Sequence, residues 1–86
     1  MPYYRKKPVV VEAKQWDGSE QGALEIIRWL ADTKTPAYTG EDGYSLHIRT
    51  LSGPVQVQPN DYVIRGVAYE AYPCDPDIFM RTYEDA

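Results

Sequence analysis

The sequence has little of what metal centres, disulfides and membrane spans require. Its 86 residues include one cysteine, Cys74, and one histidine, His47. A single cysteine cannot close an intrachain disulfide, and a structural zinc site needs about four cysteine or histidine ligands. No apolar run approaches the roughly 18 residues that cross a bilayer. We therefore expect no metal, no cofactor and no membrane partner, and a cytoplasmic protein whose cysteine stays reduced.

Basic residues are also scarce. Nine lysines and arginines oppose thirteen aspartates and glutamates, so the formal net charge is −4. Proteins that bind DNA or RNA without sequence preference need a broad basic surface, and we do not expect a nucleic-acid polymer as partner. The short basic run at residues 5–7 is typical of a solvated arm. We predict a flexible arm over residues 1–7 and one domain over the whole chain, residues 1–86.

Aromatic residues are abundant instead. Eight tyrosines and two tryptophans are many for this length, and such rings are enriched at protein interfaces. A chain of this size buries only roughly 60–65% of its unfolded surface, which leaves a thin core. Self-association would cover the spare rings, so we expect a homo-oligomer.

The hydrophobic pattern predicts an α+β fold. We expect one helix packed on a mainly antiparallel, curled sheet of about five strands, with a short helical turn near the C-terminus. The predicted strands cover residues 8–16, 44–51, 55–58, 61–66 and 67–72. In the second and third of these, Tyr44, Leu46, Ile48, Val55 and Val57 should face inward.

One helix is indicated between residues 16 and 34, with Asp17 or Ser19 as its N-cap. Its apolar stripe should comprise Ala23, Leu24, Ile27, Leu30 and Ala31. Trp29 lies off this stripe, so it either packs against a neighbouring segment or contacts another chain. The predicted core consists of Val11, Leu24, Ile27, Leu30, Ile48, Val57, Ile64 and Phe79.

The stretch EAYPCDPDIFMRTYE, residues 70–84, contains the cysteine. Its two following aspartates disfavour a reactive thiolate, so we interpret Cys74 as structural rather than catalytic. Pro73 should end the last strand, Asp75 should cap the segment that follows, and Pro76 suits a first helical position. Ile78 and Phe79 should then insert into the core and hold the C-terminus on the sheet.

Two segments resemble small proteins of bacteriophages and prophages: YRKKPVVVEAKQW (4–16) and PNDYVIRGVAYEAYPCDPDIFMRTYE (59–84). The chain departs from that pattern at Asn60 and Tyr69, where glycine is usual, and at Asp75, where lysine is usual. The last change reverses a charge beside Cys74, which speaks against anion binding there. The resemblance implies a phage context in a bacterial host and no particular activity.

These observations favour a small, non-enzymatic accessory phage protein that binds a partner in the host cell cytoplasm. The partner would be a host protein, which it inhibits, or a small anionic ligand such as a nucleotide signal. The alternative is a minor structural or assembly component of the virion, which deletion of the gene would distinguish. Candidate ligand- or partner-binding residues are Trp29, Arg49, Arg65, Tyr69, Tyr72 and Asp75. The arginines suit an anion, although the pattern favours the simpler interpretation, in which they are exposed strand residues that balance nearby carboxylates.

Overall fold

The computed structural model describes residues 2–4, 9–66, 68 and 70–86. Part of the predicted arm, residues 1–7, and the candidate Tyr69 lie outside this description. The elements in chain order are β1 (Glu12–Gln15), α1 (Glu20–Trp29), β2 (Ala37–Thr39), β3 (Leu46–Thr50), β4 (Gly53–Val57), β5 (Tyr62–Arg65), β6 (Ala71–Cys74) and α2 (Pro76–Thr82).

The strands form two antiparallel sheets of three strands each, in the orders β1-β5-β6 and β2-β3-β4. The α+β class is confirmed, but the single curled sheet of five strands is wrong. The sheets meet where β6 approaches β3 and β4. Their ladders do not join there, because Pro73 has no N–H to donate and the N–H of Ala71 donates to Thr35 Oγ1 at 2.6 Å.

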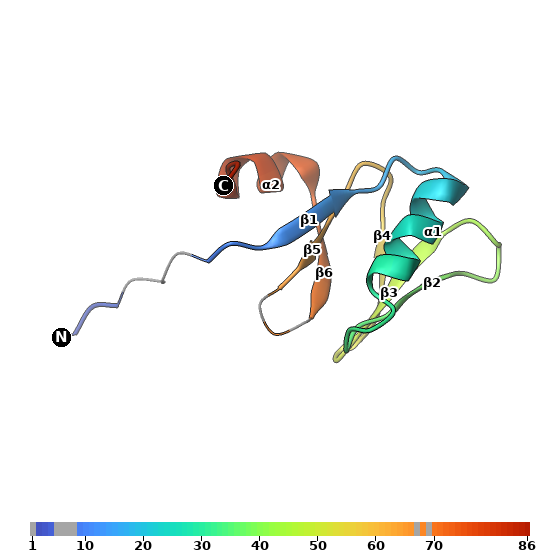
Figure 1. Cartoon of the computed structure of the whole chain (residues 1–86), viewed down its shortest axis with the longest axis horizontal. Coiled ribbons are helices and arrows are strands. Elements are labelled where there is room, and N and C mark those ends of the chain that lie inside the picture. The colour runs from blue at the N-terminus through green and yellow to red at the C-terminus, as the bar shows by residue number, and fades with distance from the viewer. Residues whose placement is uncertain (1, 5–8, 67, 69) are drawn as a thin grey trace.

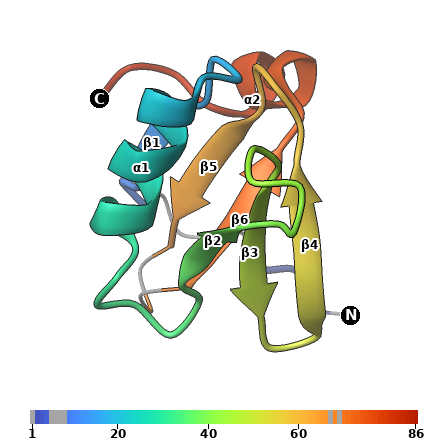
Figure 2. The same cartoon turned by 90° about the vertical axis from the view of Figure 1, so that its right-hand side faces the viewer.

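Figure 1 shows the β1-β5-β6 sheet in the middle of the molecule, with α1 and the second sheet on one side and α2 on the other. Figure 2 shows α1 lying over β1 and β5, and the β2-β3-β4 sheet lying over β6. We call the side of the β1-β5-β6 sheet that faces α1 its inner face, and the side that faces α2 its outer face.

The hydrophobic core lies against the inner face. Its buried residues are Trp16, Ala23, Ile26, Leu30, Ala37, Leu46, Ile48, Val57, Val63 and Ala71. Trp16 was not predicted to be buried, and its indole N–H donates to the carbonyl of Ser19 at 2.9 Å, which ties β1 to the start of α1. Ser19 is the N-cap of α1, and Asp17 accepts bonds from the Ser19 N–H and hydroxyl instead.

Several predicted inward positions are exposed. Leu24 and Ala31 lie on the solvent side of the α1 region, and Ile26 is buried in their place. The helix is rotated about its axis relative to the prediction, because it packs on the sheet through Ala23, Ile26 and Leu30. Tyr44 precedes β3 in a turn, and Val55 lies on the edge strand β4, so both side chains are exposed.

The C-terminal segment is partly as predicted. Asp75 caps α2 by accepting from the N–H groups of Asp77 and Ile78, and Pro76 takes the first helical position. Two other predictions are wrong. β6 continues through Pro73 to Cys74, which an edge strand tolerates. Ile78 is exposed, and α2 has no buried residue, because the helix lies on the outer face and not in the core.

Candidate functional site

Three aromatic rings stack where α2 lies on the outer face. The rings of Tyr62 and Phe79 are 3.8 Å apart at their centroids and nearly parallel, with an interplanar angle of 8°. Tyr83 continues the stack, 4.9 Å from Phe79 at 24°. Phe79 and Tyr83 are four residues apart, so the turn of α2 brings both to one side. All three rings are half-buried and keep part of their surface open to a ligand.

A hydrogen bond between tyrosines extends this cluster along the sheet. The hydroxyls of Tyr72 and Tyr83 are 3.3 Å apart. This bond, together with burial, raises the pKa of Tyr72 to about 12. Ile64 lies beside Tyr72 in the ladder and is completely buried, so it provides an apolar floor beneath the rings.

The stack forms one wall of a groove of about 800 Å³, which we call the α2 groove. Its lining residues are Val9, Val10, Val11, Ala13, Tyr62, Phe79, Met80, Tyr83, Glu84, Asp85 and Ala86. Most of the lining residues are apolar or aromatic, and Glu84 and Asp85 add negative charge. Such a surface suits an apolar or aromatic side chain with a cationic neighbour.

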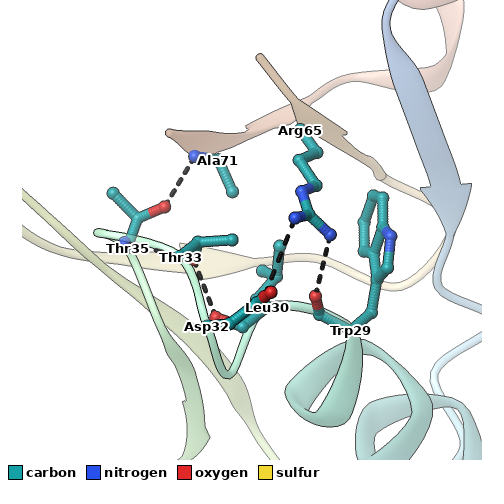
Figure 3. Close-up of polar contacts among 7 residues, drawn as sticks. All are labelled: Trp29, Leu30, Asp32, Thr33, Thr35, Arg65 and Ala71. Atoms are coloured by element: carbon teal, nitrogen blue, oxygen red, sulfur yellow. Dashed lines mark hydrogen bonds and ion pairs between the residues drawn. The ribbon is translucent and has the colours of Figure 1, made fainter. Parts of the chain in front are cut away.

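Of the sequence-predicted residues, Trp29 and Arg65 lie together on the inner face, away from the groove. Arg65 donates to the backbone carbonyl of Trp29 at 3.3 Å and forms an ion pair with Asp32 at 3.7 Å, as Figure 3 shows. Lys14 lies over the Trp29 ring, 5.4 Å from its centroid. These contacts join β5 to the C-terminal end of α1, where a cation is also favourable to the helix dipole.

Arg49 lies in the other sheet. Its guanidinium is 5.2 Å from the centroid of the Tyr38 ring, which also stacks on His47. Arg49 and Arg65 therefore belong to different clusters. Tyr72 and Asp75 are the two candidates nearest the α2 groove, because one bonds to Tyr83 and the other caps α2.

Asp42 and Ser45, in the turn before β3, meet His47 of that strand. The Ser45 hydroxyl donates to Asp42 at 2.9 Å and lies 3.0 Å from Nε2 of His47. In a serine hydrolase the histidine lies between the serine and the acid and accepts the serine proton. Here the serine is the middle member and gives its proton to the acid. The N–H groups of Ser45 and Tyr44 also donate to Asp42, and these bonds lower its pKa. The three residues therefore stabilise the turn, and they do not have the order of a catalytic triad.

Cys74 has the character of a structural thiol. Burial and the negative charges of Asp75 and Asp61 raise its pKa, so little thiolate exists at neutral pH. Its thiol lies 3.6 Å from the carbonyl of Asp75, within the α2 cap. Among the residues that the structure describes, no group of three or more His, Cys, Asp or Glu side chains is arranged to hold a metal ion.

Sequence reasoning missed the α2 groove because it assigned Phe79 and Val11 to the core. The sequence did contain a signal, however. Tyr62, Phe79 and Tyr83 are three large rings, which is more than a short C-terminal helix needs in order to contact a small core. The valines before Glu12 were another signal: β1 begins only at Glu12, and Val9 and Val10 are exposed.

With the fold and the groove defined, the chain is an α+β protein with two three-stranded antiparallel sheets and a candidate groove on the outer face. Comparisons with protein-family models, curated proteins and solved structures each return no match. In the described part of the chain, no helix is long and apolar enough to cross a membrane.

Proposed function

We propose that the protein is a non-enzymatic binding protein of a bacteriophage or prophage, which acts in the infected bacterium by holding a polypeptide partner in the α2 groove. The observation that carries this proposal is the groove itself, in which stacked, half-buried rings and exposed valines form a concave apolar surface. Aromatic residues in concave surfaces are the usual anchors of protein interfaces.

The charge of the groove selects among partners. Glu84 and Asp85 lie in its lining, and neither candidate arginine does. A segment with an apolar anchor and neighbouring lysines or arginines would gain attraction from these carboxylates, whereas a phosphate or another anion would be repelled. The groove therefore favours a basic segment of a host protein over a small anionic ligand.

Three labelled peptides that share a tryptophan-leucine centre test the proposal by fluorescence anisotropy. Their flanks are lysine, serine or glutamate. We expect affinity to fall in that order, because Glu84 and Asp85 attract lysine flanks and repel glutamate flanks. The tryptophan-leucine centre is the same in all three peptides. Stronger binding of the glutamate peptide, or of anionic nucleotides, would contradict the proposal and favour a site at Arg49 or Arg65.

Two exposed residues of α2 provide matched variants. Met80 and Ile78 are 68% and 55% exposed, and only Met80 lines the groove. We expect Met80→Ser to weaken the lysine peptide about three- to tenfold, and Ile78→Ser to leave it unchanged. In infected bacteria, a specific partner should co-purify with Ile78→Ser and not with Met80→Ser. Equal behaviour of the two variants would show that the groove is not the binding surface.

A further inference from the structure

The two edges of the β1-β5-β6 sheet differ. At one edge, Pro73 of β6 lacks an N–H and the N–H of Ala71 is bonded to buried Thr35, so no strand can add there. At the other edge, β1 pairs with β5 on one side, and no strand in the described part of the chain lies on its second side. An edge of this kind is a template for a further strand.

The backbone groups that face outward from β1 follow from its pairing. The N–H of Trp16 donates to Asp61 at 3.0 Å, so Trp16 faces the β5 side. Backbone groups alternate in direction along an antiparallel strand. The backbone N–H and C=O groups of Glu12 and Lys14 therefore also point towards β5. Those of Val11 and Ala13 point towards the open edge.

The chain preceding β1 is suited to a longer strand. Val9 and Val10 are 50% and 76% exposed, and they continue directly into the half-buried Val11. β-branched residues favour extended pairing. A second strand beside β1 would therefore find further backbone and side chains to pair with beyond the four residues that pair with β5.

We propose that two copies of the protein form a dimer in which β1 pairs antiparallel with β1 of the second copy, centred on Ala13. This register places Glu12 of each copy opposite Lys14 of the other, at both symmetry-related positions. A register centred on Glu12 or on Lys14 would place identical charges opposite each other, which is unfavourable. The alternation of charge around Ala13 thus selects one register.

The dimer has a consequence for the α2 groove. The two β1-β5-β6 sheets join into one sheet of six strands, and the two-fold axis runs perpendicular to it. Both outer faces then lie on the same side, so the two grooves, each lined by its own Ala13, open in the same direction. A partner with two binding segments would gain avidity from this arrangement. The dimer itself does not depend on what the groove binds.

Reversal of the two charges tests the register. In Glu12→Lys the dimer would place two lysines opposite each other at both positions, and in Lys14→Glu it would place two glutamates opposite each other. We expect sedimentation equilibrium to show a dimer for the wild type and at least about tenfold weaker association for each variant alone. A mixture of the two variants should form a heterodimer, because all facing charges are then opposite.

The mixture controls for effects within one copy. Glu12 also lies opposite Arg65, and Lys14 lies over Trp29, so each variant alters its own fold slightly. Mixing cannot repair those contacts, so recovered association must come from the pairing across the interface. Ala13→Pro is an independent variant: it removes the outward N–H at the centre without touching the β5 ladder, and it should abolish the dimer.

Three results would overturn the proposal. The wild type could remain a monomer up to about 1 mM, weaker than any dimer of use at cellular concentrations. A dimer could persist in Ala13→Pro and in both charge variants, which would place the interface elsewhere. Alternatively, Met80→Ser could abolish the dimer while the charge variants do not, which would make the α2 groove the contact between copies.

Discussion

The inner face of the β1-β5-β6 sheet is covered by α1 and the second sheet, whereas α2 lies on its outer face (Figure 1). On the inner face Val63 and Ala71 are almost completely buried in a continuous core. On the outer face Tyr62, Phe79 and Tyr83 stack on one another and stay half-exposed. Alternation of side chains along β5 sends neighbouring residues into these two environments.

The difference separates stability from binding. Removing apolar atoms from a close-packed interior costs their transfer free energy and leaves a cavity. A half-exposed ring has already kept part of its surface in water, and its loss leaves no closed cavity. We therefore expect the inner face to contribute most to the free energy of unfolding, and the stacked rings of the outer face to tolerate change while they determine binding.

Leu30→Ala should have the largest effect. Leu30 is completely buried between α1 and the sheets. The truncation should lower the free energy of unfolding by about 2–5 kcal/mol, which is a large part of the stability of a small domain. Urea denaturation followed by circular dichroism measures this change. Leu24→Ala, on the exposed side of the same helix, serves as control and should cost less than about 1 kcal/mol.

Thr35→Val should come next. Its hydroxyl is buried and accepts the N–H of Ala71 where β6 meets the loop before β2, as Figure 3 shows. Valine keeps the shape of the side chain and leaves that N–H without its partner, at a cost of about 1–3 kcal/mol. Hydrogen exchange of the Ala71 amide should accelerate in the variant. Unchanged exchange would show that this bond does not hold the β6 edge.

Phe79→Ala should cost about 1–2 kcal/mol, less than the 3–5 kcal/mol typical of a fully buried phenylalanine. The ring is half-buried, and it loses mainly its contacts with Tyr62 and Tyr83. Phe79→Leu retains apolar area and should recover part of the loss. A cost equal to that of Leu30→Ala would mean that the outer face carries as much of the stability as the core does.

The inner face was easier to predict than the outer face. Leu30, Ile48 and Val57 follow the periodicities of a helix and of alternating strands, and they are buried as predicted. Local patterns do not contain the rotation of a helix about its axis, so Leu24 and Ile26 were exchanged. They also do not show the side of a sheet on which a short helix lies, because that depends on contacts between distant segments.

Other features were too short or too non-local to read. β2 has three residues, which is less than a period-two pattern needs to be recognised. The end of β6 was misplaced because Pro73 forbids a central strand but not the edge strand that the topology creates. The capping of α2 by Asp75, by contrast, is a local contact within three residues, and the sequence predicts it.

Tyr83→Phe should produce the smallest change, and it concerns the outer face alone. The Tyr83 hydroxyl is the main cause that raises the pKa of Tyr72 to about 12, from 10.0. A raised pKa means that the folded state keeps the proton more tightly than the unfolded state does. This contribution to stability is complete below about pH 10 and is lost as the pH rises towards 12. Without the hydroxyl, the pKa of Tyr72 should fall towards 10, and this part of the loss of stability at alkaline pH should shrink.

Urea denaturation at several pH values between 9 and 11 would compare how steeply the free energy of unfolding falls with pH in the wild type and in Tyr83→Phe. Tyr38→Phe, on the other sheet, serves as control. Parallel slopes for the wild type and Tyr83→Phe would show that the bond between Tyr72 and Tyr83 does not couple the outer face to folding.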